Sequence, residues 1–196
     1  LLRHVRERRS AAHAVVGDAL AATRTRRLVA RLAALAASAP GPGARVVCRA
    51  AASGLVRPLV RSVRQAGRKV EDEPSTDALH VLRVRVKRLR YALESLDGLG
   101  GDAVRTLTRR LAGLQELLGE QRDAVSQQAW LRAEAATFAG EPETLLAVGA
   151  LCEALRRRAK RLVRQVPAAR DRALRHKLVT AVLRELAGRS LARAAA

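Results

Sequence analysis

The stretch LHVLRVRVKRLRYALE, Leu79–Glu94, guides the interpretation of the whole chain, because it sorts apolar and basic side chains with the period of a helix. At about 100° per residue, five apolar side chains in and just after the stretch fall within one arc of about 80° and form a packing seam. The seam consists of Leu82, Val86, Leu89, Leu93 and Leu96. A separate arc of about 100°, called the 80–94 face below, holds His80, Arg83, Lys87, Arg90, Tyr91 and Glu94. Arg85 and Arg88 lie on the remaining flank.

The charges of this stretch are almost all of one sign. Side chains three or four residues apart on a helix are neighbours, so like charges at these spacings repel. An exposed helix usually offsets such charges with acids four residues away, but the first acid after Leu79 is Glu94. The stretch by itself is compatible with an ordinary solvated surface and with a surface that binds an anion.

The composition of the whole chain favours an anionic partner. Lys and Arg number 38 against 18 Asp and Glu, which gives the 196 residues a net charge of +20. An excess of this size indicates attraction to a polyanion: nucleic acid, an anionic membrane or an inorganic phosphate chain. We expect no membrane partner, because no segment approaches about 18 uninterrupted apolar residues and the apolar seams leave little surface for lipid.

Helix-forming residues dominate the sequence and no segment keeps the alternation of a strand. We therefore predict an all-α fold, an antiparallel bundle of long helices. The expected helices cover about residues 2–37, 44–70, 77–96, 102–136 and 143–175, and a helical tail begins at His176. We expect an interruption near Thr23–Thr25 and breaks at PGPG (Pro40–Gly43) and GEP (Gly140–Pro142).

Two local features refine these boundaries. The polar turn EDEPSTD, Glu71–Asp77, offers Ser75, Thr76 or Asp77 as a cap for the helix that follows. Pro58 either kinks the helix that contains it or begins a new one.

Two further helices carry basic stripes. The 57–68 stripe consists of Arg57, Arg61, Arg64 and Arg68, and the 157–164 stripe of Arg157, Lys160, Arg161 and Arg164. We expect the three helices to pack so that both stripes and the 80–94 face converge on one groove. Such a groove would repel itself when empty and would be stabilised by a bound polyanion.

Two strings in the chain resemble a known family. HVLRVRVKRLRYALE, His80–Glu94, resembles the signature H-x-x-R-V-x-x-K-R-L-R-Y-A-L-E of the CHAD domain, the conserved-histidine α-helical domain. LAGLQELLGEQRDAV, Leu111–Val125, resembles the second hallmark of that family, L-x-x-L-Q-x-x-L-G-x-x-x-D. The resemblance implies a two-repeat helical bundle that binds inorganic polyphosphate in a basic channel or groove, often fused to a CYTH triphosphate-tunnel domain.

The resemblance also implies roles for individual residues. The polyphosphate site would be lined by His80, Arg83, Lys87, Arg88 and Arg90, with Tyr91 at its edge, and we add Arg57, Arg61, Arg64, Arg68, Arg157, Lys160 and Arg164 from the two stripes. Structural support would come from Gln115, Gly119 and Asp123 of the second hallmark. We expect Gly119 to allow close helix approach, and Asp123 either to pair with an arginine of the basic face or to be an ordinary exposed acid.

The first repeat of the family also has a His/Arg helix, but no such string precedes residue 79 here. Either the leading helices lie upstream of Leu1 or the chain is a half-site variant. We expect one domain over residues 1–196, in which residues 1–70 hold the remainder of the first repeat with a connecting helix and residues 71–196 form the second repeat.

The expected activity is non-catalytic binding of polyphosphate in the cytoplasm, at polyphosphate granules. The four histidines form no HxxxH or HExxH pattern, and PGPG lacks the Lys-Ser/Thr of a phosphate-binding loop, so neither a metal, a cofactor nor an enzymatic reaction is expected. Nonspecific nucleic-acid binding is the alternative, since arginines contact any phosphate backbone. One Trp, one Tyr and one Phe leave few stacking platforms for bases, which disfavours it.

Overall fold

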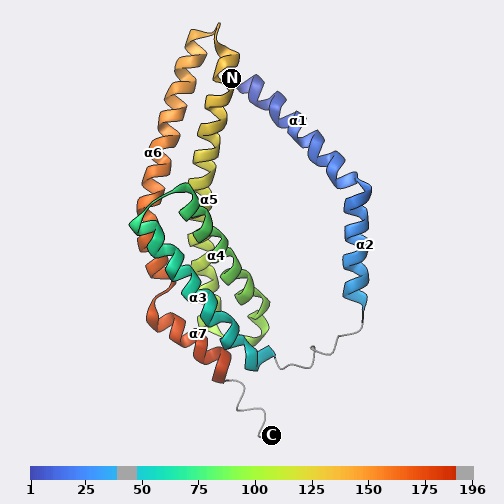
Figure 1. Cartoon of the computed structure of the whole chain (residues 1–196), viewed down its shortest axis with the longest axis vertical. Coiled ribbons are helices and arrows are strands. Elements are labelled where there is room, and N and C mark those ends of the chain that lie inside the picture. Colours follow the sequence, from blue (N-terminus) through green and yellow to red (C-terminus); the bar gives the residue numbers. More distant parts are fainter. Residues whose placement is uncertain (39–47, 189–196) are drawn as a thin grey trace. The chain divides into compact units, whose positions relative to one another are not determined.

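The computed structural model describes residues 1–38 and 48–188, and it divides the chain into two units, Leu1–Arg45 and Val46–Ala196. Within the described ranges every regular element is a helix, which confirms the predicted all-α bundle. The first unit contains α1 (Leu2–Ala21) and α2 (Thr23–Ala37). The second contains α3 (Cys48–Asp72), α4 (Thr76–Ser95), α5 (Asp102–Glu134), α6 (Pro142–Ala173) and α7 (His176–Gly188), with 3₁₀ turns at Asp97–Leu99 and Ala135–Phe138 (Figure 1).

Local sequence signals account for several helix ends. Ala22 takes an extended conformation (φ −61°, ψ 146°) and separates α1 from α2, beside the predicted interruption at Thr23–Thr25. The hydroxyl of Ser75 accepts a hydrogen bond of 3.1 Å from the backbone N–H of Ala78, so Ser75 is the cap of α4. The predicted break at PGPG lies outside the described residues.

Pro58 lies inside α3 and does not begin a new helix there, so that alternative is wrong. A proline removes one backbone hydrogen bond from a helix interior and crowds the preceding turn. On either side of it, Val56 and Val60 are buried in the core of the second unit. Burial of these side chains outweighs the local cost and keeps the helix continuous.

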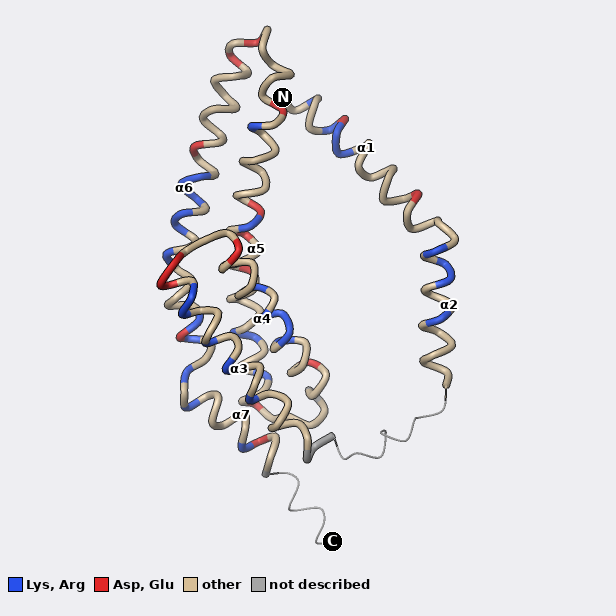
Figure 2. The backbone as a smooth tube through the Cα atoms, viewed as in Figure 1, with Lys and Arg blue, Asp and Glu red and all other residues tan. Residues whose placement is uncertain are grey.

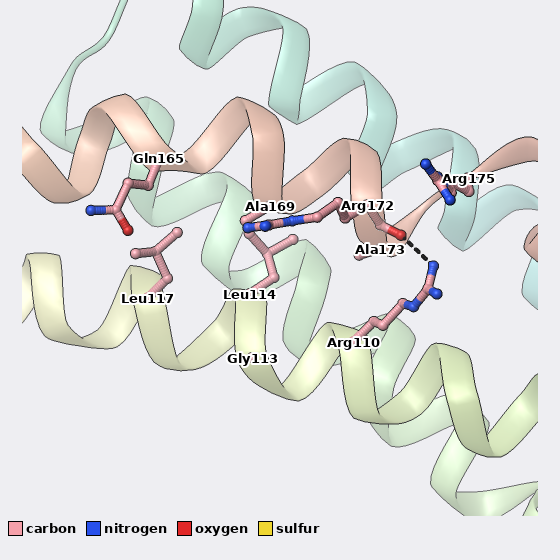
Figure 3. A pocket seen from close by; sticks show the side chains of 9 residues that line it. All are labelled: Arg110, Gly113, Leu114, Leu117, Gln165, Ala169, Arg172, Ala173 and Arg175. Atoms are coloured by element: carbon pink, nitrogen blue, oxygen red, sulfur yellow. Dashed lines mark hydrogen bonds between the residues drawn. The ribbon is translucent and has the colours of Figure 1, made fainter.

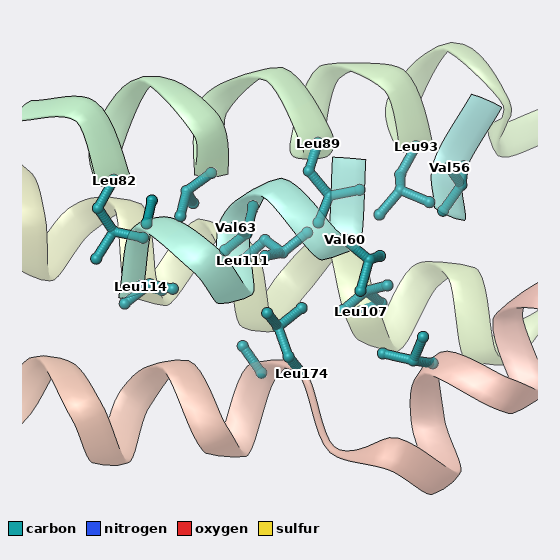
Figure 4. Close-up of a cluster of buried hydrophobic side chains, with 14 of the residues drawn as sticks. Val56, Val60, Val63, Leu82, Leu89, Leu93, Leu107, Leu111, Leu114 and Leu174 are labelled. Atoms are coloured by element: carbon teal, nitrogen blue, oxygen red, sulfur yellow. The ribbon is translucent and has the colours of Figure 1, made fainter. Parts of the chain in front are cut away.

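The second unit is a ring of packed helices around one apolar core. α4 packs against α3 and α5, and both of these pack against α6 and α7. The predicted seam of α4 is its contribution to the core, since Leu82, Val86, Leu89 and Leu93 are completely buried. Figure 4 shows Leu82, Leu89 and Leu93 facing core residues of neighbouring helices, among them Val56, Val60, Val63, Leu107, Leu111, Leu114 and Leu174.

Side chains from other helices hold the turn between α6 and α7. Arg64 of α3 donates a hydrogen bond of 3.1 Å to the carbonyl of Leu174, and Arg110 of α5 donates one of 2.7 Å to the carbonyl of Arg172. Cations near the last carbonyls of a helix satisfy them and interact favourably with its dipole. The two arginines therefore fix the end of α6 from two sides.

The α1–α2 unit is different, because none of the side chains in residues 1–38 is buried. Apolar side chains of both helices are exposed: Leu2, Val15, Val16, Leu20, Leu28, Val29, Leu32 and Leu35. In neither unit do the described helices include a segment long and apolar enough to cross a membrane.

Candidate functional site

The two hallmark strings meet in a groove between α4 and α5, called the α4/α5 groove below. It is a pocket of about 80 Å³. His80 and Arg83 of the first string line one wall, and Gln121 and Arg122 of the second string line the other. The remaining lining residues are Thr76, Leu79, Leu118, Val125 and Ser126.

The buried seam of α4 explains why arginines border this groove. Arg83 and Arg90 each follow a completely buried leucine, Leu82 and Leu89, and they lie seven residues apart, so they share one side of the helix. Both side chains are half-buried. In the part of the chain that the structure describes, the buried Nε of each has no hydrogen-bond partner. A buried donor without an acceptor is costly, and a bound anion could supply one.

Gln115 extends this side of α5. It lies seven residues before Arg122 and therefore on nearly the same side of the helix. Its side-chain oxygen is buried and, among the described residues, has no hydrogen-bond donor. The sequence suggested a structural role for Gln115. Its buried oxygen, however, finds no hydrogen-bond donor among the described residues.

Side-chain contacts within α4 moderate the repulsion on the 80–94 face. The ammonium of Lys87 lies 5.3 Å and the guanidinium carbon of Arg90 lies 4.9 Å from the centre of the Tyr91 ring. Arg90 also forms an ion pair of 3.1 Å with Glu94. Cation–π contacts at exposed sites contribute about 0.5–1 kcal/mol each, so Tyr91 helps this surface to tolerate its charge.

Arg88, which the family resemblance assigned to the same site, lies elsewhere. It follows Arg83 by five residues, or about 140° around the helix, and it is exposed. Arg85 is half-buried and lines a separate groove of about 580 Å³ between α3 and α4, together with Arg68 and Lys69. The basic side chains of α4 therefore serve at least two surfaces.

The 57–68 stripe borders a third groove, called the α3/α7 groove below. This pocket of about 460 Å³ is lined by Arg64, Arg68, Arg170, Asp171, Leu174, Arg175 and His176. Arg57 and Arg61 continue the stripe along α3, and both are exposed. Figure 2 shows the basic positions along α3, α6 and α7.

The 157–164 stripe points to this edge of the bundle as well. Arg157, Lys160 and Arg164 precede Asp171 by 14, 11 and seven residues, which places all three within about 40° of it on α6. All three are exposed. Arg157 shares Glu153 with Arg156, and hydrogen bonds from these two arginines lower the pKa of Glu153 to about 2.

The expected convergence on a single groove is therefore found only in part. The 57–68 stripe and the 157–164 stripe share the edge formed by α3, α6 and α7, whereas the 80–94 face borders α5. In the ring of helices of the second unit, α4 lies across from α6 and α7. The α4/α5 groove and the α3/α7 groove are therefore on opposite edges. None of the grooves described here combines residues of all three basic surfaces.

The second hallmark departs from one expectation and agrees with one of the two alternatives given for Asp123. The prediction that Gly119 allows close helix approach is wrong, because a Cβ at this position would meet no described atom within 4 Å. Asp123 is exposed, and no described arginine forms an ion pair with it, so it fits the alternative of an ordinary exposed acid.

Residues outside the hallmark positions were missed. Gln121 and Arg122 line the α4/α5 groove, although both occupy variable positions of the second hallmark. For Arg122, the available signal was its spacing of seven residues from Gln115, which places both on nearly the same side of the helix. Arg170 was missed for a different reason, since its burial and its ion pair of 2.7 Å with Glu71 of α3 depend on tertiary packing.

A further groove lies between α5 and α6, on the other side of the α6–α7 turn. This pocket of about 500 Å³ has an apolar floor that includes Leu114, Leu117 and Ala169. Figure 3 shows Arg110 reaching across it to the carbonyl of Arg172. In the described ranges, no group of three or more His, Cys, Asp or Glu side chains is placed to hold a metal ion.

Comparisons with known proteins agree with the geometry at the level of the family. No curated protein matches the chain. The family model described as "CHAD domain" matches residues 1–132, a range that contains both hallmark strings and therefore both walls of the α4/α5 groove. The chain thus belongs to the CHAD domain family.

Proposed function

We propose that the chain binds inorganic polyphosphate without transforming it, and that the α4/α5 groove is a binding site. One observation carries the proposal: His80 and Arg83 of the first hallmark line the same groove as Arg122 of the second. The CHAD family is associated with polyphosphate binding, and this groove is where the two hallmarks of the family meet.

The chemistry of the groove supports an anionic ligand. Its described lining contains two arginines, a histidine, a glutamine and two hydroxyl groups, and no carboxylate. Arg90 extends the basic rim along α4. The buried Nε atoms of Arg83 and Arg90 have no hydrogen-bond acceptor among the described residues. Hydrogen bonds between charged groups and phosphate oxygens contribute about 1.5–3 kcal/mol each, so a few of them account for specific binding.

The groove lining also favours binding over catalysis. General acid–base chemistry usually relies on a carboxylate or histidine oriented by a second group, and His80 has no such partner among the residues that line the groove. A location in the cytoplasm at polyphosphate granules, and an association with a CYTH domain, remain predictions from the family resemblance.

A triple variant tests the proposal: Arg83→Gln, Lys87→Gln and Arg122→Gln. All three changes remove cations at or beside the groove, and we expect the affinity for tripolyphosphate in this groove to fall at least about 100-fold, since even two lost contacts amount to about 3 kcal/mol. Isothermal titration calorimetry measures the affinity. The matched control removes three exposed cations elsewhere in the same unit, Arg109→Gln, Arg132→Gln and Arg184→Gln, and should change the affinity less than about threefold.

A competition experiment separates this function from nonspecific nucleic-acid binding. At equal phosphate concentration and physiological salt, long polyphosphate should displace duplex DNA from the wild-type protein, and binding should weaken steeply as salt is added. Displacement of polyphosphate by DNA, or a triple variant that binds like its control, would contradict the proposal.

A further inference from the structure

We propose, on the basis of the function proposed above, that the chain carries two separate polyphosphate sites and thereby bridges two phosphate chains. The second site is the α3/α7 groove. Two described surfaces on opposite edges of one helical ring are each basic and each hollowed, and this arrangement carries the inference.

Some cations in the α3/α7 groove already have partners within the protein. Arg64 donates to the carbonyl of Leu174 at 3.1 Å. Arg170 is paired with Glu71 and with Asp171, both at 2.7 Å, so the one acid of the groove lining is already engaged. These two arginines secure the packing of α3 against the end of α6.

The other cations of the groove are free to bind a ligand. Arg68, Arg175 and His176 are exposed, and no side-chain hydrogen bond or ion pair engages them within the described residues. Arg57 and Arg61 continue the basic edge along α3 for about 16 Å at 1.5 Å per residue. The groove therefore offers a linear track of cations, which suits a linear polyanion.

The two grooves cannot share a short ligand. They use different pairs of walls, α4 with α5 and α3 with the α6–α7 turn, and the apolar core lies between them. A ligand of three phosphates in one groove leaves the other groove open, so each groove acts as an independent site.

Independent sites on opposite edges change what the protein does to long chains. A polyphosphate held in one groove leaves the second groove facing outward, where it can hold another chain. Each protein molecule then becomes a cross-link, and many cross-links gather long chains into a network through multivalency. The inference assigns the protein a role in condensing polyphosphate as well as binding it.

Titration with tripolyphosphate and light scattering with long polyphosphate test the inference on the full chain. The wild-type protein should bind two equivalents of tripolyphosphate and should scatter light when long polyphosphate is added. The groove variants are Arg83→Gln/Lys87→Gln/Arg122→Gln and Arg68→Gln/Arg175→Gln/His176→Gln. Each groove variant should bind one equivalent of tripolyphosphate and should still bind long polyphosphate. With long polyphosphate, light scattering should require a protein concentration at least about tenfold higher than for the wild type.

The control variant Arg109→Gln/Arg132→Gln/Arg184→Gln loses three charges outside both grooves and should behave like the wild type. One equivalent bound by the wild type, or scattering by both groove variants that equals the control, would overturn the inference and leave the proposed function intact. Absence of any binding by the wild type would overturn both. If a triple variant unfolds on a thermal scan, the single variants Arg68→Gln and Arg83→Gln decide the matter. Each should weaken the binding of only one of the two tripolyphosphate molecules.

Discussion

The α1–α2 unit and the second unit have similar helical patterns but very different burial. α2 spaces Leu28, Leu32 and Leu35 as a packing seam would, and each of these side chains is more than half exposed. α4 carries an equivalent seam in an equally basic helix, and Leu82 and Leu89 are completely buried. The difference shows that periodicity defines which side of a helix is apolar, whereas a core forms only where another helix presents a matching apolar side.

The same contrast holds at the helix ends. Neither α1 nor α2 has a side-chain cap at its start. α4 begins with a cap from Ser75, and the carboxylate of Glu185 on α7 accepts hydrogen bonds from the backbone N–H groups of Gly101, Ala103 and Val104 at the start of α5. In the second unit, therefore, a local cap secures the start of α4, and a tertiary contact secures the start of α5, whose N–H groups local sequence would leave to water.

The largest difference between the units should appear when one leucine of each seam is shortened. Leu89→Ala removes a completely buried side chain and should lower the free energy of unfolding by about 2–5 kcal/mol. Leu32→Ala, at a position that is 56% exposed, should change it by less than about 0.5 kcal/mol. Chemical denaturation followed by circular dichroism measures both. Equal losses would show that α2 also contributes to a core.

An intermediate effect should distinguish the arginines that hold the second unit together from those on its surface. Arg170→Met breaks the ion pairs with Glu71 and Asp171 but keeps an aliphatic side chain, and it should cost about 1–3 kcal/mol of unfolding free energy. Arg157→Met on the same helix breaks an exposed pair with Glu153 and should leave the melting temperature unchanged. A melting temperature that falls equally in both variants would mean that burial does not separate the two classes.

The smallest effect should be a pH dependence that Glu185 contributes. Burial raises the pKa of Glu185, but the hydrogen bonds from Ala103, Val104 and Gly101 outweigh it and hold the pKa below the ordinary value of 4.5. A carboxyl whose pKa is lower in the folded state stabilises the fold above its unfolded pKa, and this contribution is lost as the pH falls through the folded pKa.

Glu185→Gln should therefore lower stability by about 1–2 kcal/mol at pH 7, and the difference from wild type should shrink as the pH falls below about 4.5. Thermal melting at several pH values measures it. A constant difference between pH 7 and pH 3 would show that the carboxylate charge has no part in securing α5.

Much of the helix layout and the family could be predicted from the sequence. The seam Leu82–Leu96, the cap at Ser75 and the interruption beside Thr23 follow from periodicity and from capping chemistry, which act over a few neighbouring residues. The CHAD hallmarks are likewise contiguous strings. Local rules sufficed for these features because their causes are local.

The candidate site could be predicted only in part. A helical wheel correctly separated Arg83 and Lys87 from the seam of α4, but it gave no information about the partner helix that supplies Arg122. It also grouped Arg64 with Arg68, although Arg64 is engaged by the carbonyl of Leu174. Gly119 was assigned a packing role that the neighbouring helices do not create.

The sequence alone thus determined which residues are helical, which side of each helix is apolar and which side is basic. Only the tertiary structure decided that the 80–94 face borders α5 while the 57–68 stripe borders α7, and which arginines are engaged by carbonyls and acids. The physical reason is that periodicity gives each side chain an angle about its own helix axis, whereas the neighbour it meets depends on how the helices pack around their shared core.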